Sequence, residues 1–270
     1  MMPLLNIITN IIISNLGNVD TLGLRYGKIG ICMYLYRYAM YTRQEYYSRI
    51  ADSLIDEVYR CGRDNVPTDI YNGMAGIGVG LCHLLSEGFA TGHAENVLSG
   101  IDQLMFENMN RVFMNDVQSF RPLFSSGIYL LHRIPLCDNC RLSDKMAGFM
   151  NSCESLVAEY MKKNVRRSMV DSLFMVFDNL KQYGNDLLRP SKQLMDQVQW
   201  LKEHIHQDFY DKPDCILDWW TFLCHRRPMA INDGQLQQLV SLKIEQYPYN
   251  MDTISGDLSV LGLILLNKRQ

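Results

Sequence analysis

The sequence lacks an excess of basic charge. Its 26 lysines and arginines are outnumbered by 29 aspartates and glutamates, which gives a net charge of −3. A surface that binds nucleic acid needs a basic patch or stripe, and the sequence contains no such run. We therefore expect no nucleic-acid partner.

Long hydrophobic runs are also missing, and about 20 consecutive apolar residues are needed to cross a bilayer. The apolar N-terminal stretch, residues 1–17, contains no lysine or arginine, whereas a secretory signal begins with a basic region. Polar residues interrupt it, among them Asn6, Asn10, Ser14 and Asn15. We predict a packed amphipathic helix here, with no signal peptide and no membrane span.

Several motifs of known chemistry are absent. The sequence has no GxxxxGK[ST] phosphate loop, no GxSxG nucleophile motif and no HExxH metal motif. Its eight cysteines follow no disulfide framework, which in a chain of 270 residues is typical of reduced thiols. We predict a cytoplasmic protein.

What the sequence does contain is a repeat of about 46 residues. The motif GxxGI occurs twice, and its second glycines, Gly30 and Gly76, are 46 residues apart. Similar steps lead to four further apolar segments, centred near Gly127, Ser172, Asp218 and Gly262. A fixed period of this length is typical of repeated supersecondary units.

Apolar and amphipathic segments alternate along these repeats. The repeat segments are apolar nearly all round, as buried helices are, and longer amphipathic segments lie between them. Residues 43–60, for example, place Tyr46, Ile50, Leu54 and Val58 four residues apart. No strand-like alternation competes with this pattern.

The pattern predicts an all-α fold, an α/α toroid of six helical hairpins with an inner apolar ring and an outer amphipathic ring, in one domain over residues 1–270. The final repeat is as apolar as the others, whereas an open array needs polar end repeats. The alternative is an open helical solenoid of the same hairpins.

Glycine is concentrated at the starts of the predicted inner helices. A dinucleotide-binding glycine motif follows a strand, and no strand is expected before Gly73. Glycine also lets a helix start approach its neighbours without a Cβ in the way. We therefore predict structural roles for six glycines, namely Gly27, Gly30, Gly73, Gly76, Gly127 and Gly262.

The segments "LGLRYGKIGICMYLYRYAMYT", "YYSRIADSLIDEVYR" and "DIYNGMAGIGVGLCHLLSEGF" together resemble the lanthionine synthetase C-like family, particularly its small Bacteroidetes-type members. The similarity covers residues 20–110 and continues more faintly to the end of the chain. The resemblance implies an α/α toroid and a relation to enzymes that add cysteine thiols to dehydrated Ser or Thr residues of a peptide, with a zinc ion that activates the thiol.

The zinc ligands that the resemblance implies are not at their expected places. Arg167 stands where the family has its first cysteine, and Pro213 and Asp214 stand where it has Cys-His. Cys215 is displaced by two residues, and one thiol alone does not hold zinc, which takes at least three protein ligands. We expect no metal and no cofactor unless a register shift recruits Cys215.

Other cysteines and histidines offer weaker candidates. Cys82-His83 and Cys224-His225 lie inside predicted inner helices, where neighbouring side chains diverge by about 100°. Cys137 and Cys140 form a CxxC pair in a loop without a second pair nearby, and their role stays open. We interpret the first two pairs as packing residues. His204 and His206 diverge on an outer helix, and we expect both to face solvent.

Acidic and aromatic residues gather at the predicted mouth of the toroid. They are Asp69, Tyr71, Asp171, Asp214, Asp218, Trp219 and Asp257. Two carboxylates facing one pocket would suit glycoside hydrolysis, whereas single carboxylates at helix starts serve as N-terminal caps. Trp219 and Trp220 would contact a peptide or a sugar if they line the mouth, and otherwise they belong to the core.

The functional hypothesis is a zinc-free relative of the peptide cyclases that binds a peptide or small molecule at the toroid mouth without cyclising it. Two alternatives stay open. One is a hydrolase or glycosidase-like enzyme that uses the mouth carboxylates, and the other is an active cyclase with a zinc site rearranged around Cys215 and Cys224.

Overall fold

A computed structural model describes residues 2–61, 66–111, 120–137, 154–155, 158, 191–204, 233–246 and 251–267 of the chain. These residues form helices and connecting loops without any strand, so the part of the protein that the structure describes is all-α, as predicted. The chain divides into two compact units, Met1–Gly92 with Asp218–Gln270, and His93–Leu217.

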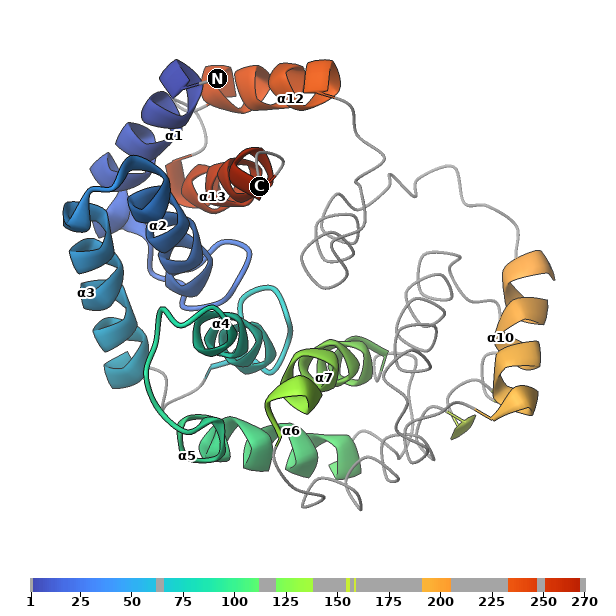
Figure 1. The fold of residues 1–270 in the computed structure, drawn as a ribbon. Helices are drawn as coiled ribbons and strands as arrows, with labels where there is room; N and C mark the ends of the chain where they lie inside the picture. Colours follow the sequence, from blue (N-terminus) through green and yellow to red (C-terminus); the bar gives the residue numbers. More distant parts are fainter. Residues whose placement is uncertain are drawn as a thin grey trace. The chain divides into compact units, whose positions relative to one another are not determined.

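The first unit contains six α-helices and a short 3-10 helix among its described residues (Figure 1). They are α1 (Met2–Ser14), η1 (Leu16–Asn18), α2 (Lys28–Thr42), α3 (Glu45–Cys61), α4 (Met74–Ser86), α12 (Asp233–Gln246) and α13 (Met251–Asn267). None of the described helices of the chain is long and apolar enough to cross a bilayer.

Helix α2 is the centre of the first unit. Ten of its fifteen residues are buried, because α3, α4 and α13 pack around it. The Tyr34 side chain is fully buried, and its hydroxyl lies 2.7 Å from the Thr9 hydroxyl of α1, so neither polar group is left without a partner. The helix ends where Arg43 adopts a left-handed conformation with φ 57°.

Helices from the two ends of the chain lie side by side in this unit. Helix α13 packs against both α2 and α1 (Figure 1). A Cβ atom placed on Gly262 would lie 2.3 Å from the ring of Tyr34, so the two helices approach each other as closely as glycine allows at this point. The repeat predicted at Gly262 is therefore a direct neighbour of the repeat at Gly30.

The buried face of α3 differs from the predicted one. Leu54 and Val58 are buried as expected, but Tyr46 is 60% exposed and Ala51 takes its place in the core. The reason is geometric, since a spacing of four residues advances about 40° beyond a full turn at each step. The line from Tyr46 to Val58 therefore winds around the helix instead of following one face.

The second unit contains the described helices α5 (Ala94–Val97), α6 (Ser99–Arg111), α7 (Phe120–Arg133), η4 (Ile134–Leu136) and α10 (Lys192–His204). Residues 94–109 place Val97, Ile101, Leu104 and Met105 at helical spacing, as one amphipathic helix would, but the chain bends at Leu98 and forms two helices. The Ser99 hydroxyl donates to the Asn96 carbonyl at 3.0 Å, a local side-chain bond of the kind that bends helices.

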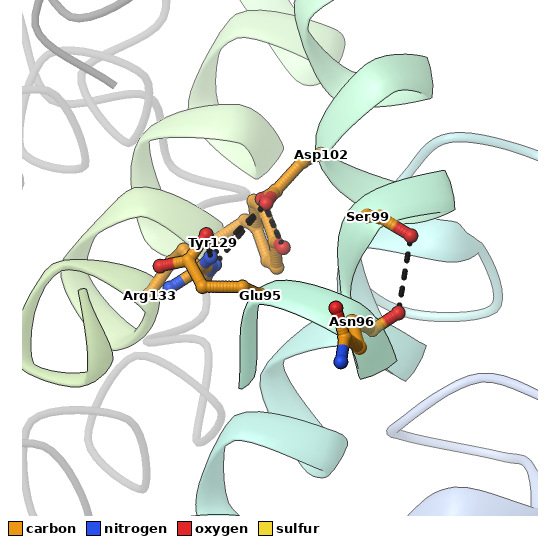
Figure 2. A network of polar contacts seen from close by, with 6 residues as sticks. All are labelled: Glu95, Asn96, Ser99, Asp102, Tyr129 and Arg133. Atoms are coloured by element: carbon orange, nitrogen blue, oxygen red, sulfur yellow. Dashed lines mark hydrogen bonds and ion pairs between the residues drawn. The ribbon is translucent and has the colours of Figure 1, made fainter. Parts of the chain in front are cut away.

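A buried polar network joins α5, α6 and α7 in this unit (Figure 2). Asp102 accepts a hydrogen bond from the Tyr129 hydroxyl at 2.6 Å and two from the Arg133 guanidinium, at 3.3 and 3.2 Å. The Arg133 side chain is 0% exposed and also forms an ion pair with Glu95 at 3.0 Å. The network supplies a buried arginine with opposite charges from two neighbouring helices, which a buried ion requires.

Candidate functional site

The loops that precede α2 and α4 have the same local geometry. The Lys28 amide donates to the Thr21 carbonyl at 3.0 Å, and the Met74 amide donates to the Pro67 carbonyl at 2.7 Å. Donors and acceptors are each 46 residues apart in the sequence, as the repeat requires. In both repeats, then, the preceding loop folds back and supplies a backbone cap to the helix N-terminus.

The two GxxGI glycines make this folded loop possible. A Cβ atom on Gly30 would lie 2.0 Å from the Leu24 carbonyl oxygen, and one on Gly76 would lie 2.3 Å from the Ile70 carbonyl oxygen. Leu24 and Ile70 are again 46 residues apart. Because the obstructing atoms belong to the backbone, these glycines serve the close approach of a loop to its own helix.

The other glycines predicted to be structural occupy related places. Gly27 and Gly73 are the N-cap residues of α2 and α4, and a Cβ on either would lie within 2.3 Å of backbone atoms of its own loop. Gly127 is buried in α7, and Gly262 meets Tyr34 as described above.

The two loops also contact each other and α13. The Arg25 amide donates to the Tyr71 carbonyl at 2.9 Å, and a Cβ on Gly23 would lie 2.3 Å from the Asn72 backbone. A Cβ on Gly256 of α13 would lie 2.3 Å from the Arg25 carbonyl oxygen. Glycines thus bring the starts of α2 and α4 and the first half of α13 together.

Five side chains gather at this junction, and we refer to them as the Arg25 cluster: Arg25, Tyr26, Tyr71, Lys243 and Asp257. Asp257 of α13 accepts a hydrogen bond from the Lys243 ammonium of α12 at 2.6 Å, and its other oxygen lies 3.9 Å from Nε of Arg25. The three charged side chains are between 18% and 33% exposed. They are therefore partly desolvated and partly exposed.

Two aromatic rings flank the arginine of the cluster. The guanidinium carbon of Arg25 lies 4.7 Å from the centre of the Tyr26 ring and 5.8 Å from that of Tyr71. A guanidinium stacked on aromatic rings gains cation–π energy and loses little freedom on binding a ligand. The cluster therefore combines charged groups with aromatic surface.

The predicted mouth residues have different environments. Tyr71 and Asp257 belong to the Arg25 cluster. The Asp69 carboxylate instead accepts hydrogen bonds from the amides of Tyr71 and Asn72, at 2.8 and 3.0 Å, and so stabilises the loop before α4. The remaining four, Asp171, Asp214, Asp218 and Trp219, lie outside the described residues.

Arg25, Tyr26 and Lys243 were not singled out from the sequence. Arg25 carried a usable signal, because it stands 46 residues before Tyr71 and so holds the same place in its repeat. Lys243 carried none, since its contact with Asp257 joins two helices that the repeat pattern does not align.

Only some of the predicted cysteines and histidines lie in the part of the chain that the structure describes. Among the residues described, no group of three His, Cys, Asp or Glu side chains is placed to hold an ion. Cys82 is buried in α4, and Cys137 is half-buried after η4. The positions at which the family resemblance implies zinc ligands, near Arg167 and Cys215, and also Cys140 and Cys224, lie outside the described residues.

His83 of α4 packs beside the ion pair that Arg37 forms with Glu87 at 2.7 Å. Burial, and next the positive charge of Arg37, lower the pKa of His83 from 6.5 to about 4, although Glu87 acts in the opposite direction. Among the residues that the structure describes, its buried Nε2 atom finds no hydrogen-bond partner. The residue is therefore a neutral packing residue at physiological pH, and its imidazole resists protonation in the folded chain.

We expect His83 to make stability fall in mild acid. Below pH 6.5 the unfolded chain takes up a proton that the folded chain refuses until about pH 4, so the free energy of unfolding should decrease as the pH falls through this window. The decrease should approach about 3 kcal/mol. Urea unfolding followed by circular dichroism between pH 4.5 and 7.5 measures it.

The variant His83→Phe should unfold with a flatter pH dependence than the wild type. The matched control is His93→Gln, because His93 is exposed and its loss should leave the slope unchanged. Equal slopes for the wild type and His83→Phe would contradict the expectation.

Comparison with family models, with curated proteins and with solved structures finds no match to this chain.

Proposed function

We propose that the chain is a peptide-binding protein, related to lanthionine synthetase C-like proteins, that holds its ligand at the Arg25 cluster and closes no thioether ring. The observation that carries this proposal is the composition of the cluster. It offers a stacked guanidinium, an ammonium, a carboxylate and two tyrosine rings, all partly exposed and supplied by separate segments. A peptide presents backbone amides and carbonyls, charged side chains and apolar side chains to such a surface.

The proposed architecture is the α/α toroid of six hairpins in a single domain. Two observations support it within the first unit. The 46-residue repeat recurs as a repeated loop geometry before α2 and α4, and α13 packs against α2. An open solenoid keeps its first and last repeats apart, because each repeat contacts only its neighbours. Closure makes these two repeats neighbours.

The two alternative functions gain no support from the described residues. The Asp69 carboxylate is engaged by backbone amides, and the Asp257 carboxylate is engaged by Lys243 and Arg25. The other carboxylates of the hydrolase hypothesis and the cysteines of the rearranged zinc site lie outside the described residues. Both alternatives stay predictions from the sequence.

A selection experiment tests the peptide-binding proposal. The purified full chain is incubated with a synthetic pool of random dodecapeptides that carry free carboxyl termini, and retained peptides are identified by mass spectrometry. We expect a retained subset that binds the wild type and loses at least ten-fold in affinity for the double variant R25Q/Y71A. A hydrolase would instead return shortened peptides.

The matched control is R49Q/Y46A, which removes the same residue types from the exposed face of α3. The side chain of Arg49 is 77% exposed and Tyr46 is 60% exposed, so this variant should bind like the wild type. The proposal fails if no peptide is retained, or if both double variants bind equally well.

A further inference from the structure

The sequence contains a single Asn-Gly pair, Asn72-Gly73, in the loop before α4. This loop comprises residues 67–73, and we refer to it as the α4 cap loop. An asparagine followed by glycine is the pair most prone to spontaneous deamidation, because glycine has no Cβ atom to hinder attack by its own backbone nitrogen on the asparagine side chain. The reaction needs only water, so the fold decides how fast it runs.

The reaction joins two atoms of neighbouring residues. The Gly73 backbone nitrogen gives up its proton and attacks Cγ of Asn72, the bond from Cγ to the side-chain nitrogen breaks, and ammonia leaves. Water then opens the resulting succinimide ring at either of its two carbonyl carbons. The products are an aspartate and an isoaspartate, and in the isoaspartate the main chain also runs through Cβ.

Hydrogen bonds hold the attacking nitrogen in the folded loop. The Gly73 amide donates to the Asp69 carbonyl at 3.1 Å, and the Met74 amide donates to the Pro67 carbonyl at 2.7 Å. The Asn72 amide donates to the Asp69 carboxylate at 3.0 Å. Attack requires the Gly73 nitrogen to lose its proton and turn toward Cγ, so its bond to Asp69 must break first.

Close packing holds the backbone on both sides of the pair. A Cβ atom on Gly73 would lie 2.2 Å from the Pro67 carbonyl oxygen, and one on Gly23 would lie 2.3 Å from Cα of Asn72. The main chain around the pair therefore has little room to rotate while the loop is closed. Ring closure has to wait for a local opening of the loop.

We propose that Asn72 is a deamidation site whose rate is set by the opening of the α4 cap loop, with Asp69 as the residue that keeps the loop closed. Aspartate at position 72 brings a negative charge to a side chain whose buried Oδ1 atom finds no hydrogen-bond donor among the described residues. Isoaspartate lengthens the main chain between Tyr71, which bonds to Arg25, and the N-terminus of α4. Both products mark, irreversibly, a molecule whose loop has opened.

Incubation of the purified full chain in mildly alkaline buffer, with and without denaturing urea, tests the proposal. Samples are digested at intervals, and mass spectrometry with chromatography measures the fractions of asparagine, aspartate and isoaspartate at position 72. We expect conversion to be at least ten-fold faster in urea than in the folded chain. Position 72 should also convert faster than any other asparagine of the unfolded chain.

The variant Asp69→Ala tests which residue closes the loop. It removes the carboxylate that holds the Tyr71 and Asn72 amides, so position 72 should convert at least five-fold faster than in the wild type without urea, and at the wild-type rate in urea. The matched control is Asp56→Ala, on the exposed side of α3, which should match the wild type in both conditions. Asp69→Asn keeps an acceptor oxygen and should convert at an intermediate rate.

Three results would overturn the proposal. Rates within two-fold of each other in the folded and unfolded wild type would show that the loop does not gate the reaction, and this comparison needs no variant to fold. Faster conversion of another asparagine in urea would remove the assignment to Asn72. Equal rates for Asp69→Ala and Asp56→Ala without urea would remove the role of Asp69.

Discussion

Adding one methyl group at Gly30 or Gly76 is expected to destabilise the chain by about 3 kcal/mol. The new Cβ atom would lie 2.0 Å from the Leu24 carbonyl oxygen in Gly30→Ala and 2.3 Å from that of Ile70 in Gly76→Ala. A flexible side chain could turn away from such a contact, but these oxygens belong to loops that also cap their helices. Relief of the clash therefore requires the cap to open.

The matched control for these variants is Gly100→Ala. Gly100 lies in helix α6, and a Cβ atom there meets nothing within 4 Å. Alanine is the better helix former, so the control should lose no stability and gain up to about 1 kcal/mol. Chemical denaturation of the three variants measures the difference, and equal stability of Gly30→Ala and Gly100→Ala would refute the close-approach role.

Replacement of Arg133 by methionine should cost about 3–5 kcal/mol, because it leaves the buried Asp102 carboxylate without its cation. Asp102 is 8% exposed and would keep only the Tyr129 hydroxyl as a neutral partner. Part of the loss should return in the double variant D102L/R133M, which removes both charges and puts apolar groups in their place.

Arg49→Met serves as the control for this network, since it breaks an exposed pair with Glu45. Its cost should stay within about 0.5 kcal/mol. Thermal and urea unfolding of all variants supply the comparison. If Arg133→Met were as stable as Arg49→Met, the buried network would contribute nothing beyond a surface ion pair.

Features that depend on spacing along the chain were accessible from the sequence. The interval between Gly30 and Gly76 predicted two equivalent helix starts, and the structure shows the same backbone hydrogen bond at both. Apolar composition likewise predicted the burial of α2 and α13. Such patterns work because local backbone geometry and burial repeat with the sequence.

Features that depend on contacts between distant segments were not accessible. The bond between Lys243 and Asp257 joins α12 to α13, and the bond between Asp102 and Arg133 joins α6 to α7. No periodicity aligns these residues, because side-chain pairing between helices depends on their rotation and crossing. The bend at Leu98 escaped prediction as well.

The packing of α13 against α1 and α2 also has a consequence for biosynthesis. Of the described helices, α13 leaves the ribosome last, while the two helices that it covers leave first. Until then the apolar surface of α2 that meets α13 stays uncovered, whereas residues 93–217 form a continuous unit whose segments emerge together. The core of the first unit is therefore completed only after residues 93–217 have been synthesised. During that interval the exposed apolar surface of α2 is available to chaperones.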